Sequence, residues 1–128
     1  MYNEFTNYKE SIKITKQALK EFRDDIDYYL PDSWETGKYA YPWQVSDEED
    51  TPKIVYGIIS DAVHKILETD MANHIAAELR NILNEYKTAM EVEDVNNRII
   101  VCQGVLHRVM DEFSMISLVC NAVKDKIV

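Results

Sequence analysis

Residues 95–127 have the sequence VNNRIIVCQGVLHRVMDEFSMISLVCNAVKDKI, and this stretch decides the fold class. Apolar side chains recur along it at alternating spacings of four and three residues: Val95, Ile99, Cys102, Leu106, Val109, Phe113, Ile116, Cys120, Val123 and Ile127. Such spacing is the period of an α-helix that buries one face. Asp94 precedes the run and is the expected N-cap of this helix, because its carboxylate accepts a hydrogen bond from the first turn.

The same stretch carries more apolar residues than one face needs. Between Ile99 and Val119 they spread around the helix, so we expect a central helix that is buried on several sides. Gly104 and residues 114–117 are the places where a break in this long helix is expected.

Three earlier segments show the same helical period. The first, residues 6–30, has its expected buried face at Tyr8, Ile12, Thr15, Leu19, Phe22, Ile26 and Tyr29, and Pro31 ends it. The second begins at Thr51-Pro52 and has its face at Val55, Ile58, Ile59, Ala62, Ile66 and Leu67. The third is expected to be capped by Thr69-Asp70, with Met71, Ile75, Leu79, Ile82, Tyr86 and Met90 directed inward. The sequence therefore predicts an all-α fold, a compact bundle of about four helices in a single domain, residues 1–128.

Composition and charge restrict the environment of this chain. Its 128 residues contain no apolar run long enough for a membrane span and no signal-peptide core near Met1, so a soluble, cytoplasmic protein is expected. Cys102 and Cys120 both fall in the apolar stripe and are expected to be reduced core thiols. The net charge of −9 repels phosphates and anionic lipids, so direct nucleic-acid or membrane binding is not expected, whereas a partner with a basic surface is attracted.

Residues 31–50 lack helical periodicity and predict a long ordered loop between the first two helices. The loop combines aromatic and acidic side chains: Trp34, Tyr39, Tyr41, Trp43, Asp47, Glu48, Glu49 and Asp50. Its six acidic residues and one lysine give a net charge of −5. Tyr and Trp are enriched at interface hot spots, and neighbouring carboxylates steer a basic partner, so these eight residues are the predicted partner-binding site. The alternative is that the aromatic rings cap one end of the bundle and the acids are only solvated.

Other patterns have a surface interpretation. A basic stripe lies along the first helix: Lys9, Lys13, Lys16, Lys20 and Arg23. His64, His74 and His107 are each followed four residues later by an acidic residue, a spacing that suits a surface pair and also a metal or acid–base site. No Glu-x-x-His motif of a di-iron bundle, no Gly-rich phosphate loop and no Cys-x-x-Cys pair occurs.

These observations predict a non-enzymatic protein without a metal or other cofactor that binds a protein partner, one with a basic nucleic-acid-binding surface, and inhibits or neutralises it. Immunity proteins and phage-encoded inhibitors of bacterial defence nucleases work in this way, and they are named here as an analogy. Two alternatives stay open, a metal-dependent helical-bundle hydrolase that uses the His–carboxylate pairs, and a structural subunit of a helical assembly.

Overall fold

The computed structural model describes residues 4–29 and 51–125, which form four α-helices and, in these two ranges, no strand. They are α1 (Glu4–Tyr29), α2 (Thr51–Leu67), α3 (Ala72–Ala89) and α4 (Val95–Asp125). The predicted all-α bundle of four helices is confirmed. The loop predicted for residues 31–50 lies outside the described residues.

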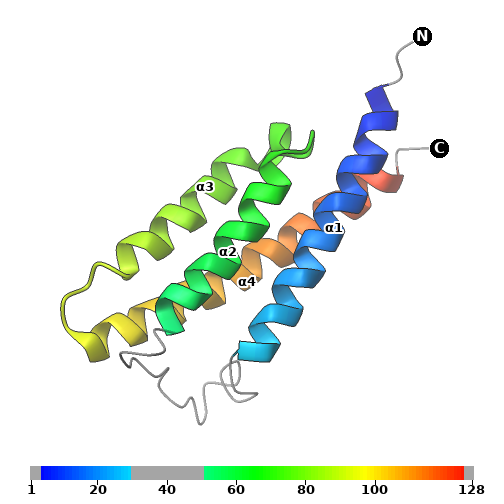
Figure 1. The fold of residues 1–128 in the computed structure, drawn as a ribbon. Helices are drawn as coiled ribbons and strands as arrows, with labels where there is room; N and C mark the ends of the chain where they lie inside the picture. Colours follow the sequence, from blue (N-terminus) through cyan, green and yellow to red (C-terminus); the bar gives the residue numbers. More distant parts are fainter. Residues whose placement is uncertain (1–3, 30–50, 126–128) are drawn as a thin grey trace.

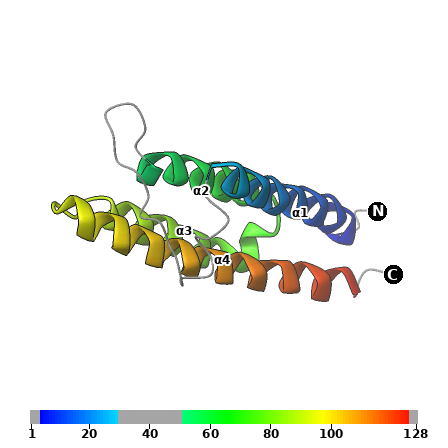
Figure 2. The same ribbon diagram turned by 90° about the horizontal axis from the view of Figure 1, so that it is seen from below.

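The helices run alternately up and down, and each packs on its two neighbours around a closed ring (Figure 1). The contacts join α1 to α2, α2 to α3, α3 to α4 and α4 back to α1. Figure 2 shows the bundle from below, with α1 and α2 in one layer and α3 and α4 in the second. The start of α1 and the end of α4 therefore lie at one end of the bundle. At the other end, which we call the Tyr29 end, α1 and α3 finish and α2 and α4 begin.

The core is built from the inward faces of all four helices. Among the largest fully buried side chains are Ile26 of α1, Ile59 of α2, Tyr86 of α3 and Leu106 of α4. Removing an aliphatic side chain of this size from water contributes about 1.5–3 kcal/mol. Phe22 and Phe113 join α1 to α4 by an edge-to-face contact with ring centroids 4.6 Å apart. None of the helices in the described residues has the length and apolar composition needed to cross a membrane.

The helix ends follow one prediction and contradict another. Asp94 caps α4 as predicted, since its Oδ1 accepts a hydrogen bond of 2.9 Å from the Asn97 amide. The predicted Thr69-Asp70 cap of α3 is wrong, because α3 begins at Ala72 and no side chain bonds its first turn. The Thr69 hydroxyl instead donates to the Ile66 carbonyl at 2.7 Å, which closes the end of α2. Arg98 fixes the α3–α4 connection by donating from Nε to the Val92 carbonyl at 2.7 Å.

Helix α4 is continuous and not central, which corrects two predictions. It passes through Gly104 and residues 114–117 without a break. Each helix in the ring packs mainly on two others, and one side of α4 remains in water. The additional apolar residues of α4 lie on that side: Ile100 is 65% exposed, Leu118 60%, Met115 56% and Val101 42%.

Two side chains that the helical period assigned to the core are exposed. Tyr29, the last residue of α1, is 53% exposed, and Val95, the first residue of α4, is 45% exposed. Both are terminal residues of their helices and lie at the Tyr29 end, where periodicity alone does not indicate burial.

Two buried hydroxyls on α1 are expected to respond in opposite ways to removal. Ser11 Oγ accepts a 3.0 Å hydrogen bond from the Asp70 amide, whereas the Thr15 hydroxyl is fully buried and has no hydrogen-bond partner. We expect Thr15→Val to raise the free energy of unfolding by about 1 kcal/mol and Ser11→Ala to lower it by about 1–2 kcal/mol, because a buried polar group without a partner costs stability. Urea unfolding of both variants measures the difference. A destabilised Thr15→Val variant would mean that a water molecule satisfies this hydroxyl in solution.

Candidate interaction surface

The eight predicted partner-binding residues belong to residues 30–50 and lie outside the described part of the chain: Trp34, Tyr39, Tyr41, Trp43, Asp47, Glu48, Glu49 and Asp50. The described residues on both sides of this segment are the last turn of α1 and the first turn of α2. The segment therefore connects to the bundle at the Tyr29 end. The surface of this end is the described part of the candidate site.

An exposed tyrosine pair ends α1. Tyr28 is 81% exposed and Tyr29 53% exposed, and their rings meet edge to face with centroids 4.9 Å apart. A tyrosine ring buries a large apolar area when a partner covers it, and its hydroxyl remains available for a hydrogen bond. The sequence interpretation missed this pair because Tyr29 was assigned to the buried face and Tyr28 was not considered. The signal that identifies both is their position in the last turn of the helix, two and three residues before Pro31.

Acidic side chains precede the tyrosine pair on α1 and also occur elsewhere at the Tyr29 end. Asp24, Asp25 and Asp27 of α1 are exposed, and so are the acids of the α3–α4 connection at the same end of the bundle: Glu91, Glu93 and Asp94. Asp27 is partly neutralised by Arg23, whose Nε lies 3.3 Å from its carboxylate. The exposed lysines Lys53 and Lys87 also lie at this end, so the field there is predominantly rather than uniformly negative. The adjoining residues 31–50 add a net charge of −5.

The basic stripe of α1 is partly used within the molecule. Lys16 donates to Asn121 Oδ1 of α4 at 2.7 Å, and Arg23 pairs with Asp27 one turn along α1. Lys9, Lys13 and Lys20 are exposed. The stripe thus contributes to the α1–α4 contact, and three of its five positive charges face solvent.

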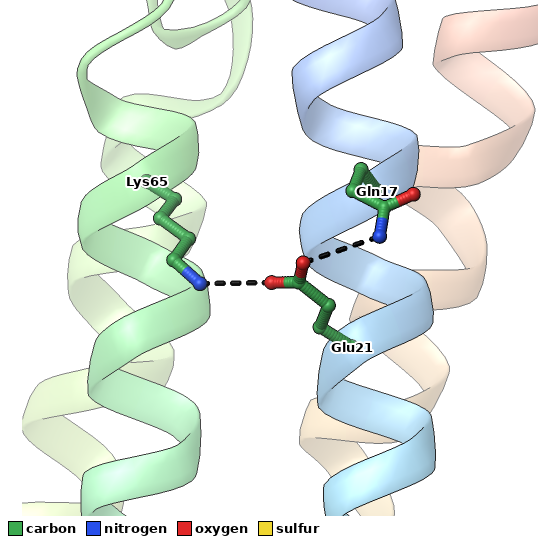
Figure 3. Close-up of polar contacts among 3 residues, drawn as sticks. All are labelled: Gln17, Glu21 and Lys65. Atoms are coloured by element: carbon green, nitrogen blue, oxygen red, sulfur yellow. Dashed lines mark hydrogen bonds and ion pairs between the residues drawn. The ribbon is translucent and has the colours of Figure 1, made fainter.

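On its other edge, α1 is joined to α2 by a polar cluster (Figure 3). Lys65 Nζ donates to Glu21 Oε2 at 2.8 Å, and Gln17 Nε2 donates to Glu21 Oε1 at 3.1 Å. The hydrogen bond from Lys65 is the main reason why the pKa of Glu21 is lowered, and the same bond raises the pKa of Lys65. A lowered carboxyl pKa means that the contribution of Glu21 to stability is present at neutral pH and is lost as the pH falls through that pKa. Since both groups are exposed to water, we interpret the cluster as a weak structural tie between two helices.

The histidines are exposed surface residues. His64 Nδ1 lies 2.7 Å from the Ser60 carbonyl oxygen and 3.1 Å from the Ser60 hydroxyl, so the ring is turned back along α2. Within residues 4–29 and 51–125, no three His, Cys, Asp or Glu side chains come together in a group that could hold a metal ion. Cys102 and Cys120 are buried in the core, as predicted, and within the described residues no disulfide joins them; burial raises the pKa of Cys120.

The described residues thus present an exposed tyrosine pair with acidic residues at the same end of the bundle, and no three of their His, Cys, Asp or Glu side chains form a group that could hold a metal ion. The exposed tyrosine pair and the acidic residues are therefore the features from which we infer a function. Comparison of the sequence with protein-family models, with curated proteins and with solved structures gave no match.

Proposed function

We propose that the protein acts by stoichiometric binding, through the Tyr29 end and the adjoining residues 31–50, to a protein partner with a basic surface. The observation that carries this proposal is the tyrosine pair Tyr28 and Tyr29, which is exposed beside Asp24 and Asp25. Large exposed aromatic rings next to carboxylates are the composition of a protein-binding surface, with the rings as anchors and the charges as the steering component.

The charge of the chain indicates what kind of partner fits. A net charge of −9 and an acidic Tyr29 end attract a surface that normally binds a polyanion, such as the groove of a nucleic-acid-handling enzyme. A protein that occupies this groove keeps the nucleic acid out. The proposed consequence of binding is therefore inhibition or neutralisation of the partner, as immunity proteins and phage anti-defence proteins achieve it.

The experiment is affinity capture from the source organism followed by binding measurements with the purified partner. We expect the double variant Tyr28→Ala/Tyr29→Ala to weaken binding about 30-fold, the equivalent of about 2 kcal/mol for the loss of an anchor. Neither ring belongs to the buried core, so the variant is expected to melt as the wild type does. Ile14→Ala is the matched control, since Ile14 is an exposed apolar side chain of α1 that is about four turns away from the tyrosine pair.

Two results would contradict the proposal. One is unchanged affinity of the tyrosine variant and of variants in residues 31–50 for a partner that binds the wild type. The other is a captured partner whose activity on nucleic acid is the same with and without a saturating amount of this protein.

A further inference from the structure

Helix α4 has a second row of residues, four of them apolar, on the side that faces away from the bundle core. Its members follow one another at spacings of four and three residues: Asn97, Val101, Gly104, Arg108, Asp111, Met115, Leu118 and Ala122. We call this row the α4 outer face. Gly104 is half-buried and the other seven residues are exposed, with Leu118 and Met115 more than half in water. Figure 2 shows α4 running along the outside of the bundle over its whole length.

Single exposed apolar residues are common on soluble proteins, but here Val101, Met115, Leu118 and Ala122 lie along one side of one helix. The opposite side of α4 packs in the core of the bundle. At its edge, the outer face contacts α3 through the ion pair of Arg108 with Glu85. The exposed apolar side chains together with the charges of Arg108 and Asp111 suit a contact with a second helix.

We propose that the α4 outer face is a homodimer interface. In it, α4 of a second copy packs antiparallel to the first, and the two-fold axis passes through the outer face midway between residues 108 and 111. In this register Arg108 faces Asp111 of the second copy, Val101 faces Leu118, and Gly104 faces Met115. Each contact occurs twice, because a two-fold interface is self-complementary. Opposite charges meet at the centre, apolar side chains meet toward both ends, and a small residue meets a long one.

Other arrangements of the same two helices lose this complementarity. In a parallel pair, equivalent heptad positions meet, so Arg108 would face Arg108 and Asp111 would face Asp111. Moving the antiparallel pair by one heptad places the Asp111 carboxylate against Val101 or against Met115. Both alternatives desolvate a charge without an opposite partner, which is costly. The charges of the row thus select one direction and one register.

Arg108 is already positioned for this role. Its Nη2 pairs with the Glu85 carboxylate of α3, which holds the guanidinium at the edge of the outer face while its side chain stays 58% exposed. A guanidinium has five N–H donors, so Arg108 has donors for Asp111 of the second copy in addition to Glu85.

The composition of the face indicates a weak dimer. At about 1.5 Å per residue the row extends over about 38 Å, but its apolar side chains are only Val101, Met115, Leu118 and Ala122. A dimer that forms in the micromolar range and dissociates on dilution is expected. Of the outer face, only Asn97 lies in the first turn of α4, at the Tyr29 end, so the proposal does not depend on the function proposed above.

The test is sedimentation velocity of the full chain from about 5 to 500 µM at physiological salt. We expect the wild type to pass from monomer to dimer in this range, and Leu118→Glu and Asp111→Lys to remain monomeric at every concentration. The matched controls are Ile14→Glu on α1 and Asp61→Lys on α2, which make the same chemical changes at exposed positions away from the face and should dimerise as the wild type does. A monomeric wild type at the highest concentration, or equal dimerisation of all four variants, would overturn the proposal.

Cysteine crosslinking tests the direction of the pair. Under mild oxidation, a mixture of Val101→Cys and Leu118→Cys should give a covalent dimer that contains one copy of each variant, and neither variant alone should give one. The native thiols Cys102 and Cys120 are buried, and the wild type treated in the same way measures their background. Crosslinking of each variant with itself would show a parallel pair and refute the antiparallel arrangement.

Discussion

Replacing Tyr86 with Ala is expected to lower the free energy of unfolding by about 3–5 kcal/mol, the cost of removing a buried aromatic side chain. Tyr86 of α3 is completely buried, and its ring stacks on Tyr56 of α2 with centroids 6.3 Å apart. Its hydroxyl donates a 2.8 Å hydrogen bond to the Pro52 carbonyl in the first turn of α2. One side chain therefore fills the core and ties α3 to the start of α2.

The conservative variant separates these two roles. Tyr86→Phe keeps the ring and removes only the hydroxyl, so we expect it to cost about 1 kcal/mol, the usual net contribution of one hydrogen bond. Tyr28→Ala is the control, because Tyr28 is 81% exposed and its removal should change stability by less than about 0.5 kcal/mol. Urea unfolding with a common slope for all variants makes the three values comparable. A Tyr86→Phe variant as stable as the wild type would show that the bond to Pro52 contributes nothing.

The second large effect is expected in the kinetics of partner binding. Replacing Trp34 or Trp43 with Ala should speed dissociation about 30-fold, because a buried aromatic anchor contributes about 2 kcal/mol or more and such losses appear mainly in the off-rate. Neutralising Asp47, Glu48, Glu49 and Asp50 together should instead slow association and reduce its salt dependence, since exposed charges act by long-range steering.

The control for the acidic variant changes four exposed acids at other places on the bundle, Glu10, Asp61, Glu68 and Glu78, to their amides. It has the same net charge as the acidic variant, so a difference in association rate between the two locates the steering charges. All variants must melt as the wild type does, because a tryptophan that packs on the bundle would cost about 3–5 kcal/mol of stability when truncated. Two results together would show that residues 31–50 have a structural role and that the partner binds elsewhere. The first is a loss of stability in the tryptophan variants. The second is that the dissociation rate of their folded fraction and the association rate of the acidic variant remain those of the wild type.

Much of the fold could be predicted from local sequence features, namely helical periodicity and helix capping. The helical period places Ile26, Ile59, Leu79 and Leu106 in the core, and all four are buried. The Asp94 cap of α4 could be predicted because its carboxylate bonds an amide only three residues along the chain. The candidate site was predicted less completely. The eight residues chosen in the segment 31–50 lie outside the described residues, and the exposed Tyr28 and Tyr29 beside them were identified only from the structure.

The sequence by itself determined which segments form helices and which face of each is apolar, because periodicity and capping depend on residues within one or two turns. Only the tertiary structure decided which apolar faces find a partner. The apolar residues around α4 predicted a central helix, yet the closed ring gives α4 two neighbours and leaves Val101, Met115 and Leu118 in water. The contacts of Ser11 with Asp70 and of Glu21 with Lys65 join residues far apart in the chain, and no local pattern indicates such pairs. Burial of a side chain depends on what packs against it, and that is a property of the assembled helices.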